Sequence, residues 1–275
     1  MLVAVFFFSL MNLLVKYLDH VPAHEVILFR SAVSFVMSFA YVKKKGIPMF
    51  GNNKKILILR GVFGVMALTM YFTTLQKIPL ASATTIQYLS PIFGTIAAYL
   101  ILKEKVYPWQ WILFGVSFTG AALVKGFDPR VDLIYFLLGL GSALFSGLAY
   151  TCVRVLKDTD HPYVIVMYFP MLALPAMIVW SFFNWYMPQS WEWLILILIG
   201  VFTQIAQVNM TKALQLEKLS IISSMKYFGV AFAFLYGYFL FGETYDWKAM
   251  LGILLVLIGV LLNMFLKFFI KRFSN

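Results

Sequence analysis

Charged residues are scarce in this chain. Asp, Glu, Lys and Arg make up 12% of its 275 residues, and hydrophobic residues make up 62%. A soluble domain carries roughly 25% charged and 45–50% apolar residues. The polar stretches between the apolar runs are too short to fold as domains of their own, and a bilayer core needs about 20 apolar residues per helix. The composition therefore excludes a soluble globular domain and predicts an integral membrane protein.

Cysteine and the common catalytic motifs are also lacking. Cys152 is the one cysteine in the sequence, which excludes an intrachain disulfide and a cysteine cluster for zinc or iron–sulfur. There is no Walker A sequence for ATP, no HExxH zinc motif and no potassium-type selectivity filter. The histidines His20, His24 and His161 lie at the edges of apolar runs and suggest no catalytic set. We expect no enzyme activity, no metal and no cofactor.

Ten apolar runs predict an all-α bundle of ten transmembrane helices. Pro91, Pro170 and Pro175 fall inside runs, where a proline removes a backbone hydrogen bond and is expected to kink the helix. The expected spans are residues 2–18, 24–42, 56–75, 81–102, 108–125, 133–156, 161–185, 191–214, 219–241 and 246–268.

The loop charges predict the orientation. The net charge is +11, and most loop cations fall on one side, including residues 43–45, 54–55 and 271–272. Cytoplasmic loops carry an excess of Lys and Arg, so both termini are expected in the cytoplasm of a multi-pass protein of the bacterial inner (plasma) membrane. Topology also explains the positive charge without a nucleic-acid partner.

A weak internal repeat appears when the sequence is shifted by 139 residues. The matching pairs include Leu75 with Leu214, Gln76 with Gln215, Tyr88 with Tyr227 and Glu104 with Glu243. Five helices per half is an odd number, so the halves would cross the membrane in opposite directions, an inverted repeat that is common in secondary transporters. We expect a first repeat at 1–126, a second at 132–268 and a cytoplasmic tail at 269–275.

Several segments resemble the drug/metabolite transporter superfamily in its EamA-domain form, as two tandem EamA repeats. The closest branch is the solute carrier 35 group G, on the segment from Glu25 to Arg30 followed by Arg60-Gly61. The resemblance implies a central cavity lined by helices 1–4 and 6–9, with helices 5 and 10 at the periphery. The second copy departs from the pattern at Lys226 and Val230. The segments that carry the resemblance are Arg60-Gly61-Val62-Phe63-Gly64, Pro79-Leu80-Ala81-Ser82-Ala83, Ser90-Pro91-Ile92-Phe93, Leu102-Lys103-Glu104-Lys105 and Tyr238-Phe239-Leu240-Phe241-Gly242-Glu243.

Two cations lie deep inside expected spans. Lys226 is about seven residues into the ninth span and Arg30 about six into the second. A charge at the bilayer centre costs about 2.5–3.5 kcal/mol on insertion scales, so both should face a cavity that holds an anion. The structural alternatives are a Lys226 that snorkels to the interface and an Arg30 that pairs with Glu25 or caps a neighbouring helix end.

Further polar residues complete the candidate site. Interior amides and tyrosines either hydrogen-bond a substrate or hold helices together. His24 and Glu25 are candidates for proton coupling, or a solvated helix start. Glu104 and Glu243 are candidate gating residues, or latches that bind helix ends or cations of the other half. The expected substrate-binding residues are Lys226, Arg30, Gln87, Tyr88, Tyr227, Gln204, Gln207 and Asn12.

Together these features favour a secondary active transporter of a small polar, anionic metabolite. The alternatives are a flippase or exporter of a lipid-linked sugar or amphipathic drug and, from another class, an intramembrane enzyme. Expected partners are the small-molecule substrate and the lipid bilayer, with the chain a monomer or homodimer through Gly115, Gly120, Gly252 and Gly259.

Overall fold

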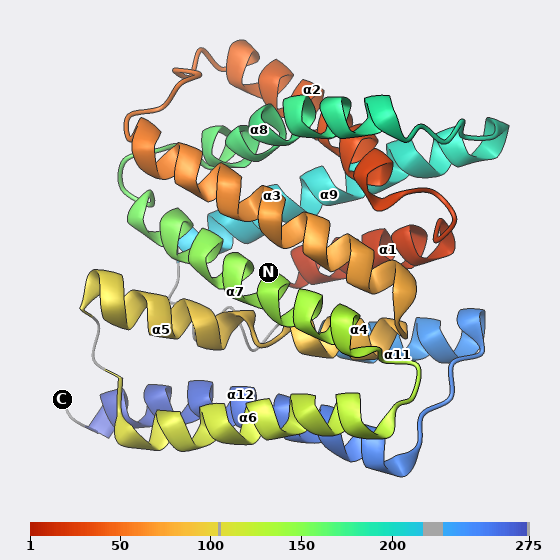
Figure 1. Ribbon diagram of the computed structural model, residues 1–275. Coiled ribbons are helices and arrows are strands. Elements are labelled where there is room, and N and C mark those ends of the chain that lie inside the picture. Colours follow the sequence, from red (N-terminus) through yellow and green to blue (C-terminus); the bar gives the residue numbers. More distant parts are fainter. Residues whose placement is uncertain (104–105, 217–227, 274–275) are drawn as a thin grey trace.

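The computed structural model describes residues 1–103, 106–216 and 228–273. The part of the chain it describes contains helices and no strand (Figure 1). The helices are α1 (Leu2–Tyr17), α2 (Ala23–Lys44), α3 (Lys54–Lys77), α4 (Leu80–Gln87), α5 (Ser90–Leu102), α6 (Pro108–Phe127), α7 (Leu133–Val155), α8 (Pro162–Phe183), α9 (Ser190–Leu216), α11 (Phe228–Phe241) and α12 (Trp247–Phe273).

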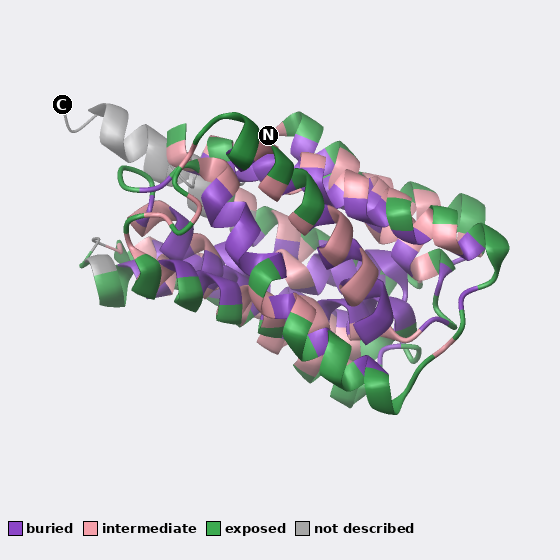
Figure 2. Ribbon diagram, turned by 90° about the horizontal axis from the view of Figure 1, so that it is seen from above, coloured by how far each residue is buried: buried purple, intermediate pink, exposed green. Residues whose placement is uncertain are grey.

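The helices have the length and surface of membrane spans. Five of them (α2, α3, α7, α8 and α9) are long and apolar enough to cross a bilayer, and α1, α11 and the Trp247–Gly259 part of α12 are shorter apolar helices. Large apolar side chains such as Phe182 and Ile112 are exposed on the outside of the bundle, while the residues coloured as buried gather toward the middle of the bundle (Figure 2). The chain is thus an all-α integral membrane protein whose helices follow the expected ten spans.

The fourth expected span is broken, and the break follows the sequence. α4 ends at Gln87, α5 begins at Ser90, and Pro91 lies in the first turn of α5. Proline is tolerated there because the first backbone N–H groups of a helix have no intrahelical partner. Pro170 and Pro175 lie within α8, which continues through both as one helix.

The structure confirms the internal repeat. Adding 139 to the bounds of α2, Ala23–Lys44, gives those of α8, Pro162–Phe183. The Gln76 amide donates to the Val21 carbonyl at 2.9 Å, and the Gln215 amide donates to the Asp160 carbonyl at 2.9 Å. Donors and acceptors of these two bonds are each 139 residues apart, so both halves repeat the same contact.

Helix packing obeys the same symmetry. The equivalent helices of the two halves are α1 and α7, α2 and α8, α3 and α9, and α5 and α11. α1 packs on α9, and the equivalent α7 packs on α3. In the same way α2 packs on α9 and α8 on α3, while α5 packs on α7 and α11 on α1. The two remaining large contacts, α2 with α8 and α6 with α12, join equivalent helices of the two halves. Exchange of equivalent partners is what a twofold axis between two repeats produces.

Glycines bring the peripheral helices α6 and α12 into close contact (Figure 1). A Cβ on Gly120 would lie 2.6 Å from the Gly252 carbonyl oxygen, and one on Gly259 would lie 2.8 Å from that of Leu113. Small residues let helix backbones approach in this way. Three of the glycines considered for a dimer therefore serve this internal contact, whereas a Cβ on Gly115 would meet nothing within 4 Å. A homodimer stays a prediction.

Candidate substrate cavity

A cavity of about 140 Å³ lies at the centre of the bundle. Its described walls come from α1–α5, α7–α9 and α11, and α6 and α12 contribute no described lining residue, as the resemblance implied. None of the described lining residues is acidic. The polar side chains among them are Ser9, Asn12, Arg30, Arg60, Tyr71, Thr84, Gln87, Tyr88, Ser90, Ser146, Tyr150 and Gln207.

Arg30 lies in the cavity wall and is 2% exposed. It is seven residues into α2, about 10 Å deep at 1.5 Å per residue. Its Nε donates to the Thr203 hydroxyl at 2.9 Å, and its Cζ lies 4.9 Å from the centre of the Phe169 ring. Its Nη1 is buried and has no hydrogen-bond partner. The alternative that Arg30 pairs with Glu25 is not supported among the described residues, since its partner is Thr203.

Arg60 is a second buried guanidinium, which the sequence analysis did not select. It is 3% exposed, lines the same cavity, and its Nε and Nη1 are buried without a hydrogen-bond partner. Gly64 provides its space, because a Cβ on Gly64 would lie 2.6 Å from Arg60 Nη1. The available signal was depth: Arg60 is six residues, or about 9 Å, inside α3.

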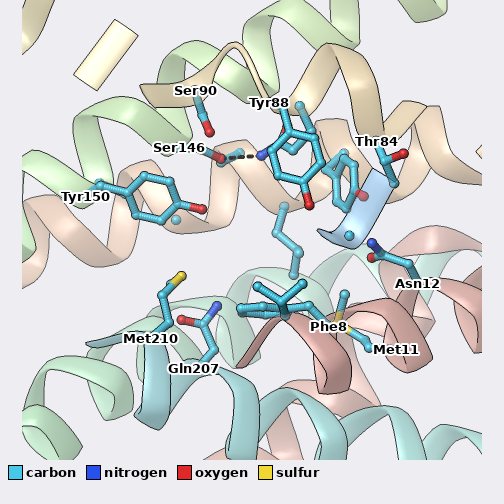
Figure 3. A pocket seen from close by; sticks show the side chains of 18 of the residues that line it. Phe8, Met11, Asn12, Thr84, Tyr88, Ser90, Ser146, Tyr150, Gln207 and Met210 are labelled. Carbon is cyan, nitrogen blue, oxygen red and sulfur yellow. Dashed lines mark hydrogen bonds between the residues drawn. The ribbon is translucent and has the colours of Figure 1, made fainter. Parts of the chain in front are cut away.

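Besides Arg30, four more of the expected binding residues line the cavity (Figure 3). Asn12 of α1 and Gln207 of α9 lie on one side, each with a buried amide oxygen that has no partner. Tyr88 lies on the other side. The Gln87 amide donates to Ser146 of α7 at 2.7 Å and accepts from Ser142 of the same helix at 2.8 Å. Tyr71, Tyr150 and Ser146 also line the cavity. They were missed because a lone hydroxyl in an apolar run gives little signal.

Gln204 does not line the cavity. Its amide oxygen accepts a hydrogen bond from Ser34, and its amide nitrogen donates to Ser38 at 2.7 Å. Both serines belong to α2, so Gln204 joins α9 to α2 and has both ends of its amide satisfied. The structure favours the helix-holding alternative for this residue.

His24 and Glu25 face a loop rather than the cavity. The His24 ring stacks on Trp180 and its Nε2 lies 2.9 Å from the Asn184 carbonyl oxygen. Glu25 is fully buried and accepts a hydrogen bond from the backbone N–H of Tyr186. Both contacts hold the start of α2 against the α8–α9 connection, and the proposed proton coupling stays a prediction.

Glu243 binds a helix end of the other repeat, one of the alternatives expected for it. Its carboxylate accepts from the backbone N–H of Leu80, the first residue of α4, with N–O distances of 3.0 and 2.9 Å. The Tyr245 hydroxyl donates to the same carboxylate at 2.6 Å and accepts from the Ala81 N–H at 3.2 Å. A negative charge at a helix N-terminus is favourable. We call Glu243, Tyr245 and the start of α4 the α4 latch.

Charges of the α6–α7 connection support the α4 latch. Arg130 forms an ion pair with Asp128 at 2.9 Å and donates to the Thr244 carbonyl at 2.6 Å. The hydrogen bond to Asp128 raises the pKa of Arg130. Burial, followed by the nearby Glu243 carboxylate, raises the pKa of Tyr245, which therefore stays a hydrogen-bond donor.

Three expected site residues, Lys226, Tyr227 and Glu104, lie outside the described residues. Their roles stay predictions. The described part of the chain defines a membrane bundle of two inverted repeats with a polar cavity at their interface, an architecture typical of secondary transporters.

Comparison with known proteins identifies the family. The EamA-like transporter family matches residues 1–126 and 133–265. The chain is 32% identical to the pseudopaline exporter CntI of Pseudomonas aeruginosa, over 93% of this chain and 91% of that protein. It is 30% identical to human solute carrier family 35 member G1, over 93% of this chain and 75% of that protein. The chain therefore belongs to the EamA-like transporter family, and the resemblance to the solute carrier 35 group G branch is confirmed.

More distant relatives share the fold. A riboflavin transporter of Vibrio cholerae is 26% identical over 94% of this chain and 90% of its own. A crystal structure with 15% identity superposes with a TM-score of 0.73, over 99% of this chain and 96% of its own. At that identity the structural match supports the fold alone.

Proposed function

We propose that this protein is a secondary active transporter that moves a small, polar, anionic metabolite across the bacterial inner membrane by alternating access between its two repeats. Positive-inside topology supports cytoplasmic termini. In this orientation the α4 latch lies at the outer side of the membrane, and the α7–α8 connection, which contains Asp160, lies at the cytoplasmic side. Relatives named as transporters support a transport role over catalysis.

The observation that carries the proposal is the pair of guanidiniums in the cavity. Arg30 and Arg60 together have three buried nitrogen atoms without a partner, and no described lining residue is acidic. Removing an ion from water without a partner costs several kcal/mol. Carboxylates and phosphates match the planar guanidinium with charge-assisted hydrogen bonds. The cavity is therefore best suited to an anion that supplies these missing partners.

The test is ligand-induced stabilisation followed by transport. The purified protein in detergent is heated with carboxylates, phosphorylated sugars, neutral nucleosides and organic cations, at constant ionic strength. A ligand at 100 times its Kd stabilises by about 2.7 kcal/mol. We expect anions alone to raise Tm, and the stabilising anions to be accumulated or exchanged by proteoliposomes.

Matched variants assign the effect to the cavity. Arg30→Gln and Arg60→Gln should lose the anion-dependent rise in Tm, while Arg130→Gln, at the α4 latch, should keep it. Stabilisation by neutral or cationic compounds alone would refute an anionic substrate. One relative is named as an exporter and another as a riboflavin transporter with no direction given, so transport is measured in both directions.

The amphipathic alternative is favoured by one feature. An apolar groove lies between α1 and α11, and Val5 lines both this groove and the central cavity. A substrate with an acyl tail would place the tail there and its polar head near the guanidiniums. This alternative would be favoured over a small metabolite if decyl phosphate raised the Tm of the protein far more than methyl phosphate did. The Phe6→Ser variant should then remove that difference. The groove is formed by Leu2, Val3, Val5, Phe6, Phe7, Phe228 and Phe232.

A further inference from the structure

We infer that the transported molecule carries two separate anionic groups, one bound by Arg30 and the other by Arg60. This inference rests on the proposed function and names the substrate class of the same cavity. It follows from the number of unpaired cations in the described wall, from their positions and from their surroundings.

The two guanidiniums come from different helices and have different neighbours. Arg30 of α2 is oriented by Thr203 of α9, which takes its Nε and leaves Nη1 unpaired. Arg60 of α3 has both Nε and Nη1 buried and unpaired. Each side chain thus has its own unsatisfied donors, and neither forms an ion pair with a described carboxylate.

Phe169 lies next to both guanidiniums. Arg30 lies over its face, with Cζ 4.9 Å from the ring centre. Arg60 lies near its Cδ2 atom, because a Cβ on Gly64 would lie 2.6 Å from Arg60 Nη1 and 2.8 Å from Phe169 Cδ2. The two guanidiniums therefore lie at different parts of one ring, and two anionic groups on one molecule match these two positions.

Charge balance requires more than one negative charge in the cavity. A monoanion would neutralise one guanidinium and leave the other buried without a counter-charge, which is the costly state of a broken ion pair. Two anionic groups on one molecule neutralise both. The second group also binds at a high effective concentration once the first is held. Asn12 and Gln207, whose buried amide oxygens have no partner, would bind the uncharged part of the molecule.

The experiment compares matched probes by isothermal titration of the detergent-purified protein at pH 7.5. The dianions are succinate, glutarate and adipate, and fructose 1,6-bisphosphate is a probe with two phosphate groups. The matched probes with one anionic group are butyrate, pentanoate, hexanoate and fructose 6-phosphate. We expect at least one dianion to bind at least about tenfold more tightly than its matched probe, with an optimum in chain length that reports the spacing of the two arginines.

Variants then separate the two subsites. Arg30→Gln and Arg60→Gln should each bring the preferred dianion within about threefold of its matched probe, whereas Arg60→Lys, which keeps the charge, should retain part of the preference. Circular dichroism and size-exclusion chromatography check that each variant is folded. If a variant is not folded, the chain-length comparison in the wild-type protein decides alone.

The outcomes are distinguishable. Equal affinity for every matched pair, with both weakened by the Arg→Gln variants, would overturn the two-group inference and leave an anion transporter. Binding of neither carboxylates nor phosphates would overturn the proposed anionic substrate as well.

Discussion

The α4 latch gives the sharpest test of how the two repeats are joined. Replacing Glu243 with Ala removes the carboxylate that accepts from Leu80 N–H, and leaves the Tyr245 hydroxyl without its acceptor. Glu243 is 7% exposed, so water cannot freely replace the lost hydrogen bonds. Glu243→Gln keeps an oxygen acceptor but removes the negative charge.

The magnitude follows from these contacts. A hydrogen bond to a charged group contributes about 1.5–3 kcal/mol, and a negative charge at a helix N-terminus adds about 0.3–1 kcal/mol. We expect Glu243→Ala to lower the free energy of unfolding by about 3 kcal/mol and Glu243→Gln by about 1 kcal/mol. With roughly 2–4 °C per kcal/mol for a protein of this size class, Tm should fall by about 6–12 °C for Glu243→Ala and by about 2–4 °C for Glu243→Gln.

The assay is thermal unfolding of the detergent-purified variants without ligand. The matched control is Asp132→Asn, because Asp132 is an exposed acidic residue at the N-cap of α7 whose side chain makes no capping hydrogen bond. Its Tm should change by less than about 2 °C. If Glu243→Ala were as stable as this control, the carboxylate would not hold α4, and our account of the junction between the repeats would be wrong.

Two further predictions separate binding from stability. Gly64→Ala should weaken anion binding by about tenfold, because the new Cβ would displace the Arg60 guanidinium. Gly115→Ala is the control, because a Cβ there meets open space. If the two variants bound the anion with equal affinity, Gly64 would not have the role we assign to it. Gln204→Leu should lower stability by about 1–2 kcal/mol and leave the Kd unchanged, because it breaks hydrogen bonds between α2 and α9. Gln207→Leu should instead weaken binding by about threefold. If titration showed weaker binding for Gln204→Leu, and thermal unfolding showed lower stability for Gln207→Leu, the roles of the two glutamines would be assigned wrongly.

Much of the fold could be predicted from the sequence because hydropathy and repetition are properties of the chain itself. Apolar runs fix which segments enter the bilayer, and the 139-residue shift relates Gln76 to Gln215 before any coordinate is known. Pro91 marked a real discontinuity because its ring has no N–H to donate. Pro170 gave the same signal without a break in α8, since a helix can continue past a proline when its surroundings accept the bend.

The site was predicted only in part. Arg30, Asn12, Gln87, Tyr88 and Gln207 line the cavity as expected. The sequence offered the same evidence for the Gln204 amide, yet the structure turns that amide toward α2. Arg60 was overlooked, although it lies six residues inside α3.

What the sequence by itself determined is the environment: an all-α membrane protein, two repeats of opposite direction, and interior polar groups that need partners. What only the tertiary structure decided is which partner each group has. A helix repeats every 3.6 residues, so a change of a few residues turns a side chain from a neighbouring helix toward the cavity, and hydropathy in a uniformly apolar span does not record that rotation. Packing sets the rotation, and thereby leaves Gln204 bonded to serines while Arg30 and Arg60 face the cavity with donors unpaired.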